Sequence, residues 1–392
     1  MPATGQTYII AGAGISGLTL SLTLAKFGAT VVVLERNETV QEAGAGLQIS
    51  PNARRVLDRL GLSLPVEQFA LEPRALDTYR RDEATPFFSM EFGPIMEERF
   101  GAPYAVMHRA DLADALYKAS RRFANIDIMF GVRRWDVVSH ARGVTVSIDE
   151  ANGQARTTRA NAFIGADGVH SQTRREALGG ADAHFEGRVA WRTLVPADSV
   201  AGHIASDSVS VFFGAGHHLV AYPLPHRRQV NLALFLPGGP DPDPARPSLQ
   251  GKGALGAILA AAGSSWTPWP LYTVQTKTWH RGNIGLVGDA AHAMVPFQAQ
   301  GAAMGIEDAA VLGPLLIEGG EPESAFARYA AMRQDRVERV AKLSASNGRI
   351  FHMRWPMSLA RDRVMQFQGP RAHLDRLGWI YGHDAGLGDF VQ

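Results

Sequence analysis

The N-terminal segment Tyr8–Glu35 constrains this chain more than any other stretch. An apolar run opens the segment and suits a fully buried parallel strand. A glycine-rich turn follows, then a run with helical spacing of apolar residues, and then a second apolar strand that ends at Glu35. The turn contains Gly12, Gly14, Ser16 and Gly17. This order of strand, turn, helix and strand is typical of a βαβ unit that binds a dinucleotide.

Each glycine of the turn has a physical task in such a unit. Gly12 permits the tight turn, Gly14 lets the backbone approach a pyrophosphate, and Gly17 lets the helix pack closely on the sheet. The pyrophosphate then lies at the helix N-terminus, and the Glu35 carboxylate accepts hydrogen bonds from an adenosine ribose. The alternative is a purely structural glycine-rich turn, which leaves the position of the acid to coincidence. We therefore predict dinucleotide binding.

The bulk composition excludes several classes of protein. Thirty-nine basic and 38 acidic side chains leave a net charge of +1, which gives no electrostatic case for binding nucleic acid or an anionic membrane. The chain has no cysteine, so disulfides, thiolate metal sites, Fe–S clusters and cysteine nucleophiles are excluded, and we expect no metal site. The absence of cysteine fits a reducing cytoplasm, and neither a signal peptide nor a membrane-spanning run is expected.

The distribution of strand patterns predicts two interleaved domains in the 392 residues. We expect an α/β fold: a Rossmann-like doubly wound parallel sheet that binds the dinucleotide, an interleaved antiparallel-sheet substrate domain, and C-terminal helices. The predicted dinucleotide-binding parts are 1–73, 104–183 and 280–392, the last with the C-terminal helices, and the substrate parts are 74–103 and 184–279. Within 126–160 we expect three antiparallel strands, with a hairpin turn at 150–153.

Two further buried strands of the first domain also end in acids. One leads to Asp167-Gly168, and another leads to Gly288-Asp289. Because strand C-termini in doubly wound sheets face one crevice, both acids can converge with Glu35 on one extended ligand. Asp289 can hold a polyol chain.

The segment after Asp289 predicts a second anion site. A loop turned by Pro296 leads to Gly301 and Ala302, where a helix begins. Unpaired amides at a helix start favour negative charge, such as the N1–C2=O edge of a reduced flavin. Since a plain nicotinamide dehydrogenase has no use for this site, FAD is favoured over NAD.

Two other features are compatible with a flavin but do not decide alone. The loop 44–52 contains Gln48 and leads into a helix with Ser50 as N-cap, so it is either a plain helix start or a flat backbone against a planar ring. Arg109 stands just before a predicted helix over 110–123, where an arginine is either solvated or shares the helix N-terminus with an anion.

At this point the chain resembles the FAD-dependent aromatic hydroxylases, single-component flavoprotein monooxygenases that include salicylate, hydroxybenzoate and hydroxynicotinate hydroxylases. The resemblance covers nearly all of residues 6–350. It implies that Glu35 and Arg36 hold the adenosine half, that Asp289 binds the ribityl side, and that the Asp167-Gly168 motif serves FAD and NAD(P)H. The residues assigned to the cofactor are Gly12, Gly14, Ser16, Gly17, Glu35, Arg36, Gln48, Arg109, Asp167, Asp289, Pro296, Gly301 and Ala302.

The resemblance also implies the reaction cycle and one local difference. NADH or NADPH reduces FAD, dioxygen then forms a C4a-hydroperoxyflavin, and its terminal oxygen attacks a ring ortho or para to a phenolate. The protein positions the ring and excludes water. The implied partners are a small aromatic substrate and O2, and a homodimer is compatible with the sequence. Many members have glycine where Ala299 stands, which predicts a slightly tighter loop beside the ring.

Four polar residues have open readings. Arg192 either pairs with a substrate carboxylate or faces solvent from its strand. Gln298 and Gln300 can face either the substrate or the ring, and we assign Gln298 to the substrate. His292 is read as structural rather than catalytic, because it sits in a cofactor loop fixed by hydrogen bonds.

The strand His218-Leu-Val-Ala-Tyr222 carries the predicted catalytic pair. Both side chains lie on one strand face, roughly 13 Å apart on a flat strand and nearer on a bent one. Some hydroxylases of the family have a His and a Tyr at this spacing, where they assist deprotonation of the substrate hydroxyl. A histidine with a pKa near neutrality can accept that proton, and a tyrosine can relay it. The alternative is a core tyrosine and a surface histidine. His217 should face the opposite side.

The predicted function is hydroxylation of a small phenolic or hydroxypyridine carboxylic acid. A related flavoprotein monooxygenase acting on a larger quinone, alkene or polycyclic substrate is the alternative, and a wide apolar cavity would favour it. A non-catalytic binding protein on the same fold is a more distant alternative, against which the intact fingerprint argues.

Overall fold

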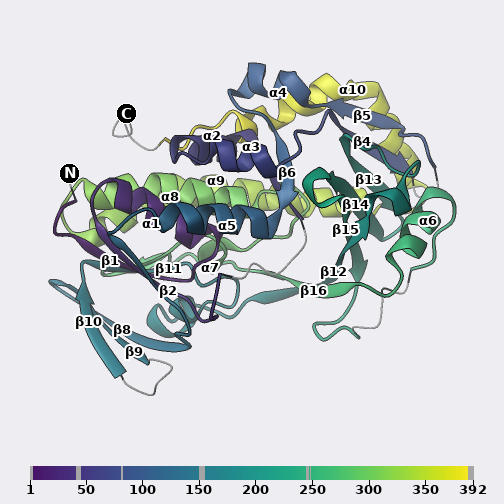
Figure 1. The fold of residues 1–392 in the computed structure, drawn as a ribbon. Coiled ribbons are helices and arrows are strands. Elements are labelled where there is room, and N and C mark those ends of the chain that lie inside the picture. Colours follow the sequence, from purple (N-terminus) through teal and green to yellow (C-terminus); the bar gives the residue numbers. More distant parts are fainter. Residues whose placement is uncertain are drawn as a thin grey trace.

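Two large β-sheets with helices around them form the protein, as Figure 1 shows. The computed structural model describes residues 3–40, 46–80, 83–149, 155–243, 247 and 249–386. The hairpin turn predicted at 150–153 and the first two residues of the loop 44–52 lie outside the described residues.

The first sheet has six strands in the order β17-β18-β11-β1-β2-β7. Five strands are parallel and β17 pairs antiparallel at one edge. Their bounds are β1 Thr7–Ala11, β2 Thr30–Leu34, β7 Ile126–Met129, β11 Ala162–Gly165, β17 His280–Arg281 and β18 Ile284–Leu286. Central strands of β-branched and other apolar residues are covered on both faces, as parallel sheets require.

One face of this first sheet is covered by helices, and the other face is covered by a small three-stranded sheet (Figure 1). The helices are α1 Ile15–Lys26, α5 Arg109–Ser120, α8 Gly301–Ile317 and α9 Pro322–Phe351. The smaller sheet consists of β8 Arg134–His140, β9 Gly143–Asp149 and β10 Ala155–Ala160. The expected doubly wound arrangement is therefore wrong in one respect, because β9 buries alternate residues against the parallel sheet where helices would otherwise pack.

The expectation for 126–160 needs one correction. Three antiparallel strands are present, but they span 134–160, and the strand at 126–129 is β7 of the parallel sheet. A short strand pattern records which side chains are buried and not which strand is the neighbour, so the sequence did not separate β7 from the other three.

The second sheet has seven strands in the order β16-β12-β15-β14-β13-β4-β5. Their bounds are β4 Ala75–Arg80, β5 Phe88–Glu91, β12 His184–Pro196, β13 Ser208–Gly214, β14 His217–Leu224, β15 Gln229–Pro237 and β16 Thr267–Thr273. The sheet is mixed rather than purely antiparallel, because β13 and β4 run parallel. These two strands come from separate segments with no hairpin between them, so no tight turn imposes an antiparallel pairing.

The two faces of the second sheet have different roles. Side chains such as Trp191, Phe212, Leu219 and Leu234 pack on one face with helix α6 (Gly253–Ala262) in a separate apolar core. Because side chains alternate along a strand, the residues between them point to the opposite face, toward the first sheet. That opposite face forms a wall of the cavity described below.

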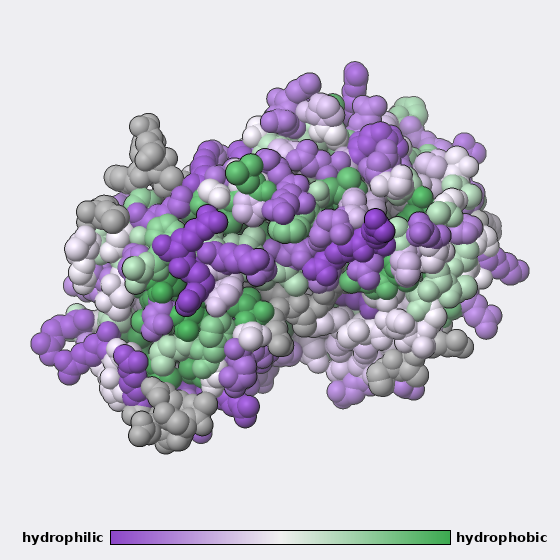
Figure 2. Space-filling view, in the orientation of Figure 1, coloured by the Kyte–Doolittle hydropathy of each residue, from purple (hydrophilic) through white to green (hydrophobic). Residues whose placement is uncertain are grey.

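The remaining elements connect and cover the two sheets. A two-stranded ribbon joins β3 Gly46–Ile49 to β6 Ala105–His108, and α10 (Met357–Tyr381) packs against β5. The other helices are α2 Pro51–Arg59, α3 Ser63–Phe69, α4 Gly93–Phe100 and the short α7 Asp289–His292. Among the described helices, none combines the length and apolar character needed to cross a membrane. Figure 2 shows hydrophilic residues spread over both halves of the visible face.

Candidate active site

One cavity of about 1150 Å³ runs from the glycine turn after β1 to the second sheet. Every residue assigned to the cofactor except Gly17 lines it, and so do Arg192, His218, Tyr222 and Gln298. Residues separated by up to several hundred positions in the chain therefore face one space. The sequence-based expectation that the acids at strand ends converge agrees with this geometry.

The glycine turn has the close contacts that the fingerprint requires. Gly12 has a φ of +106°, and a Cβ there would lie 2.4 Å from the Ala166 carbonyl oxygen. A Cβ at Gly17 would lie 2.0 Å from the Gly12 carbonyl oxygen, so no larger residue fits between α1 and the turn. Gly14 is the N-cap of α1 and leaves the first amides of the helix directed toward the cavity end.

Glu35 and Arg36 lie at the end of the cavity that is predicted to hold the adenosine. Glu35 is buried, and its carboxylate accepts hydrogen bonds from the Ala13 amide and the Asn37 amide, each at 2.9 Å. These bonds fix the carboxylate at the end of β2, where it can also accept from ribose hydroxyls. Arg36 is exposed beside it and also lines the cavity.

Ser16 serves the packing of two helices as well as the cavity wall. A Cβ at Gly305 of α8 would lie 2.0 Å from the Ser16 hydroxyl oxygen, and one at Gly288 would lie 2.5 Å from it. The two glycines therefore let α8 and the strand end approach the start of α1. Ser16 therefore connects the glycine turn after β1 with the segment that contains Gly288 and α8.

The Asp167 carboxylate is engaged by its own loop. One oxygen accepts from the Ser171 hydroxyl at 2.5 Å, and the other accepts from the Thr173 amide at 2.9 Å and the Thr173 hydroxyl at 3.0 Å. Asp167 thus holds the turn that follows β11, and Gly168 follows with a φ of +75°. Both residues line the cavity, so the assignment of this motif to cofactor contacts stays a prediction.

The start of α8 lies at the end of the cavity that is predicted to hold the flavin, called the flavin end below. Gly301 begins this helix as expected, and a Cβ there would meet only an Asp289 carboxylate oxygen at 4.0 Å, so the space above the helix start is open. Asp289 is exposed to the cavity as the first residue of α7. An open space bounded by helix amides and a carboxylate fits the pyrimidine edge and ribityl chain of a flavin.

The loop before α8 carries backbone strain at Ala299. This residue has a φ of +54°, a left-handed conformation that costs an alanine roughly 1–2 kcal/mol. The loop turns at Pro296, whose carbonyl accepts from the Ala299 amide at 3.1 Å. The left-handed backbone gives a physical reason for a glycine at this position.

The ribbon strand β3 holds the second sheet close to the flavin end. The Gly46 amide donates to the Asn231 side-chain oxygen at 2.8 Å, and a Cβ at Gly46 would lie 2.2 Å from the Tyr222 hydroxyl oxygen. Gln48 accepts from the Tyr104 hydroxyl at 2.5 Å. The part of the loop 44–52 that the structure describes is therefore more than a plain helix start, because it carries the cavity wall.

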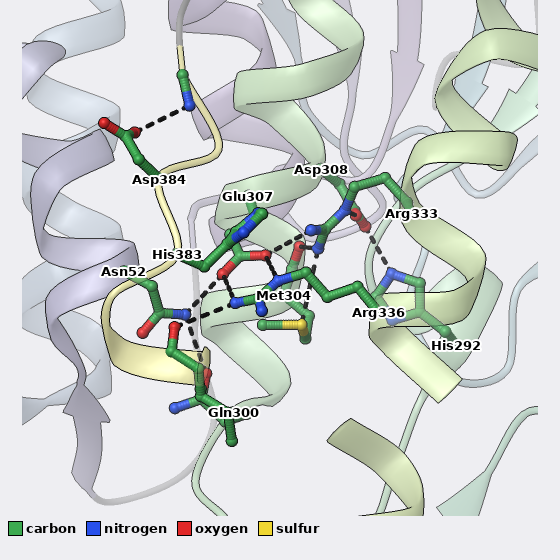
Figure 3. A network of polar contacts seen from close by, with 12 residues as sticks. Asn52, His292, Gln300, Met304, Glu307, Asp308, Arg333, Arg336, His383 and Asp384 are labelled. Atoms are coloured by element: carbon green, nitrogen blue, oxygen red, sulfur yellow. Dashed lines mark hydrogen bonds and ion pairs between the residues drawn. The ribbon is translucent and has the colours of Figure 1, made fainter. Parts of the chain in front are cut away.

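A buried charge network connects to the loop that directly precedes α8 (Figure 3). Glu307 and Asp308 of α8 both pair with Arg333 of α9, and all three side chains are at most 1% exposed. Asn52 donates to Glu307 at 2.7 Å and to Gln300 at 3.1 Å. The network therefore reaches the residue that directly precedes α8.

This network settles the open reading of Gln300 and agrees with that of His292. Gln300 is buried, donates to the Ser50 hydroxyl at 2.8 Å and does not line the cavity, so it faces neither substrate nor ring. The His292 ring bonds the Asp308 carboxylate at 2.6 Å and is also absent from the cavity wall, which agrees with the structural role.

The inner face of the second sheet forms the end of the cavity that is predicted to hold the substrate. On β14, His218, Val220 and Tyr222 point into the cavity, and on β15 the alternate residues Asn231, Ala233 and Phe235 do so. His217 is buried and does not line the cavity, as expected. The surface-histidine alternative is wrong, because His218 is only 1% exposed.

His218 is enclosed by aromatic rings. Its ring stacks on Phe235 with centroids 4.4 Å apart, and Phe297 and Phe351 lie edge-on at 5.3 Å. Burial, and after it the nearby His352 and Arg188, lowers the pKa of His218 well below its usual range. The expected pKa near neutrality is therefore wrong, since an apolar cage disfavours the charged ring. Burial also raises the pKa of Tyr222, so its phenol stays protonated.

Arg192 is a cation inside the same cavity. It lies on β12 in register with Ala233, and its guanidinium is 5.7 Å from the centroid of the Trp269 ring. Within the described part of the chain no carboxylate is within ion-pair distance of it. Burial and the positive charge of Arg109 lower the pKa of Arg192. Arg109 is the first residue of α5 and also lines the cavity.

Gln298 faces the cavity next to α9. Its side-chain oxygen accepts from the Asn347 amide group at 2.6 Å, which fixes its orientation, and it lines the cavity as predicted. Helix α10 contributes Met365, Leu377 and Tyr381 to the wall, and sequence reasoning missed these residues. No motif marks them, because their role depends only on where α10 packs.

Comparisons with known proteins identify the family. Residues 6–344 match the family described as FAD binding domain. The chain is 33% identical over 397 residues to 3-amino-4-hydroxybenzoate 2-monooxygenase PtmB3 of Streptomyces platensis, with 96% of each chain covered. It is 29% identical over 390 residues to 3-hydroxybenzoate 6-hydroxylase 1 of Aquipseudomonas alcaligenes, with 97% of this chain and 98% of the relative covered. The crystal structure of Klebsiella pneumoniae HpxO complexed with FAD and uric acid has the same fold, with a TM-score of 0.82, 22% identity and 95% of each chain covered. This chain therefore belongs to the FAD-dependent aromatic hydroxylases, and its cofactor is FAD.

Proposed function

We propose that this enzyme uses NAD(P)H and O2 to hydroxylate a small aromatic ring that carries both a carboxylate and a phenolic or pyridine hydroxyl. The observation that supports this most is the position of Arg192. A cation without an ion-pair partner among the described residues shares one cavity face with His218 and Tyr222. A buried cation requires an anion for a favourable interaction, and a substrate carboxylate supplies one.

The register of the sheet supports a substrate of small size. Arg192 on β12 pairs with Ala233 on β15, which pairs with Val220 on β14. Two strand spacings separate Arg192 from Val220, which is roughly 10 Å. A benzene ring with a carboxylate at one end and a hydroxyl at the other, plus a hydrogen bond at each end, fills such a span. In this arrangement the substrate hydroxyl lies next to Val220. His218 and Tyr222 flank Val220 on the cavity face of β14, one on each side.

The chemistry divides between the cofactor and the chain. FAD, when bound and reduced by NAD(P)H, supplies the activation of dioxygen and the transfer of one oxygen atom to the ring. The chain binds the carboxylate through Arg192 and excludes water with the phenylalanines around His218. His218 accepts the hydroxyl proton, and Tyr222, whose phenol stays protonated, relays it or orients the ring; a phenolate ring is a better nucleophile than a phenol.

The names of the relatives support an aromatic acid. The two relatives described above are named for hydroxybenzoates, one of them carrying an additional amino group. A larger polycyclic substrate remains the competing hypothesis, and the two differ in whether a substrate carboxylate is needed.

A substrate screen tests the proposal. Purified holoenzyme is mixed with hydroxybenzoates, hydroxypyridine carboxylic acids and polycyclic phenols, and NADH or NADPH oxidation, O2 uptake and peroxide are measured together. We expect an aromatic acid to stimulate oxidation with little peroxide. Arg192→Met should raise KM for 3-hydroxybenzoate about tenfold or more but leave KM for 3-hydroxybenzyl alcohol, which lacks the carboxylate, unchanged. Stimulation by polycyclic phenols alone, or by none of the compounds, would contradict it.

A further inference from the structure

Behind His218, on the side away from the cavity, lies a second histidine. The Nδ1 atom of His218 is 2.7 Å from the Nε2 atom of His352, and both rings are buried. His218 lines the cavity and His352 does not. The two rings are thus in series, with one end facing the substrate.

The outer ring is near the molecular surface. His352 follows directly after α9 and is 8% exposed, while His218 is 1% exposed. The segment that comes next contains the exposed residues Arg354 and Trp355. His352 is therefore positioned between the aromatic cage and solvent.

The surroundings of this pair disfavour a trapped charge. Phe235, Phe297 and Phe351 surround His218, and His352 also contacts Phe297 with ring centroids 5.5 Å apart. Arg188, which donates to the Gly216 carbonyl, is the nearby permanent cation. Burial, then Arg188 and His217, lowers the pKa of His352 to about 3. Holding a second proton, and with it a positive charge, on either ring is thus unfavourable at neutral pH.

We propose that His218 and His352 form a two-histidine relay that carries the substrate hydroxyl proton from the cavity to solvent. This inference rests on the proposed function, because it requires a phenolic substrate beside His218. Because His352 does not line the cavity, it acts through its contact with His218.

The proton steps balance without a charged intermediate on either ring. The substrate O–H bond breaks as an N–H bond forms at His218 Nε2. The His218 Nδ1–H bond breaks as an N–H bond forms at His352 Nε2, and the His352 Nδ1 proton leaves to water. No electrons are transferred between groups in these steps. The reverse sequence returns a proton to the product oxygen and restores both tautomers, so the relay is ready for the next turnover.

A chromophoric ligand tests the relay separately from oxygen transfer. The compound 4-hydroxy-3-nitrobenzoate carries a carboxylate and a phenol that ionises near neutral pH, and its phenolate absorbs visible light. Stopped-flow mixing with oxidised holoenzyme measures the ionisation rate, and equilibrium titration measures Kd. The variant His352→Gln keeps a hydrogen-bonding group but cannot pass a proton on. His217→Gln, which removes a neighbouring buried histidine that does not line the cavity, is the matched control.

We expect His352→Gln to slow ionisation at least tenfold, with Kd and FAD content within twofold of the wild type, and His217→Gln to leave the rate unchanged. Rates in mixtures of H2O and D2O should depend on the deuterium fraction along a curve in the wild type, because two or more protons move together. In His352→Gln the dependence should become linear. A purely structural role of His352 would leave this curvature unaltered.

Four outcomes would overturn the relay. A wild-type ionisation rate in a folded His352→Gln variant would exclude it, and a linear deuterium dependence in the wild type would exclude it even if the variant does not fold. Failure of the wild type to bind both this ligand and every acid of the substrate screen would contradict the proposed function, and the relay with it. Hydroxylation of an aromatic acid with unchanged His352→Gln kinetics would leave the proposed function intact and reject the relay alone.

Discussion

Replacing Arg333 with methionine should destabilise the flavin end of the molecule more than any surface change on the same helix. Arg333 donates to Asp308 at 2.8 Å, to Glu307, and to the Met304 carbonyl at 3.1 Å. Methionine fills part of the space but cannot neutralise either carboxylate. Two acids that are 0% exposed would then keep their charge with fewer partners.

The remaining partners set the size of the effect. Glu307 keeps Arg336, whose Nη2 atom is 2.7 Å from it, and Asp308 keeps His292 at 2.6 Å and the Gly288 amide at 2.9 Å. Breaking one buried pair costs roughly 3–5 kcal/mol. Because Glu307 retains its pair with Arg336 and Asp308 retains its hydrogen bonds with His292 and the Gly288 amide, we expect Arg333→Met to lower the free energy of unfolding by about 3–5 kcal/mol rather than by twice that amount.

A matched control lies on the same helix. Arg328 of α9 pairs with Glu318 at 2.7 Å, but the two side chains are 55% and 43% exposed. Such an exposed pair contributes about 0–1 kcal/mol, so Arg328→Met should be nearly neutral. Urea unfolding with FAD present, followed by the rise of flavin fluorescence on release, measures both variants. A difference between them below about 1 kcal/mol would refute the reasoning.

The pH dependence supplies an independent check. Arg333 and the other partners outweigh burial and hold the pKa values of Glu307 and Asp308 below their usual range. A lowered pKa gives stability that is fully present above the unfolded value of about 4 and is lost as pH falls below it. In Arg333→Met the carboxylates take up protons more readily, so the deficit against wild type should be smaller below about pH 4 than at pH 8. An equal deficit at both pH values would show that lost packing, not charge, is responsible.

Four further substitutions test other parts of the site. Glu35→Ala should weaken FAD binding by removing ribose hydrogen bonds worth roughly 1.5–3 kcal/mol each, and an unchanged Kd in a fluorescence titration would exclude the acid from the site. Ala299→Gly should be neutral or stabilise by up to about 1 kcal/mol, since relief of the left-handed strain outweighs the added chain entropy; a marked loss of stability in urea would contradict this. His218→Ala and Tyr222→Phe should each reduce hydroxylation by roughly 10²–10⁴-fold at normal FAD content, with partial rescue of His218→Ala at high pH, where the phenol ionises unaided. Because the pKa of His218 lies well below its usual range, the wild-type rate should show no His218 titration between pH 6 and 8, and unaltered turnover in both variants would place the base elsewhere.

Sequence reasoning reached most of the residues at the predicted cofactor end of the cavity because their signals are local. The run Thr7–Ala11, the glycine turn and α1 follow one another in the chain, and each is determined by side chains within a few residues. The same holds for the start of α8 at Gly301. Alternation along β14 placed His218 and Tyr222 on one face, because that periodicity depends only on strand geometry.

Tertiary structure decided the strand pairings and the covering of the sheet faces, because these depend on which distant segments pack next to one another. The parallel partner of β2 at 126–129, the parallel pairing of β13 with β4, and the covering of one sheet face by β8–β10 all have strand patterns that fit other arrangements equally well.

The same limit applies within the site. His352 stands 134 positions from His218, and nothing in its own segment marks it as a partner. Gln298 and Gln300 are two positions apart in one loop, yet one faces the cavity and the other binds Ser50. The sequence by itself determined the local elements and the FAD fingerprint, because neighbours in the chain specify them. Packing alone decided which rings meet and how burial displaces their pKa values, because proximity and desolvation arise only when distant segments exclude water together.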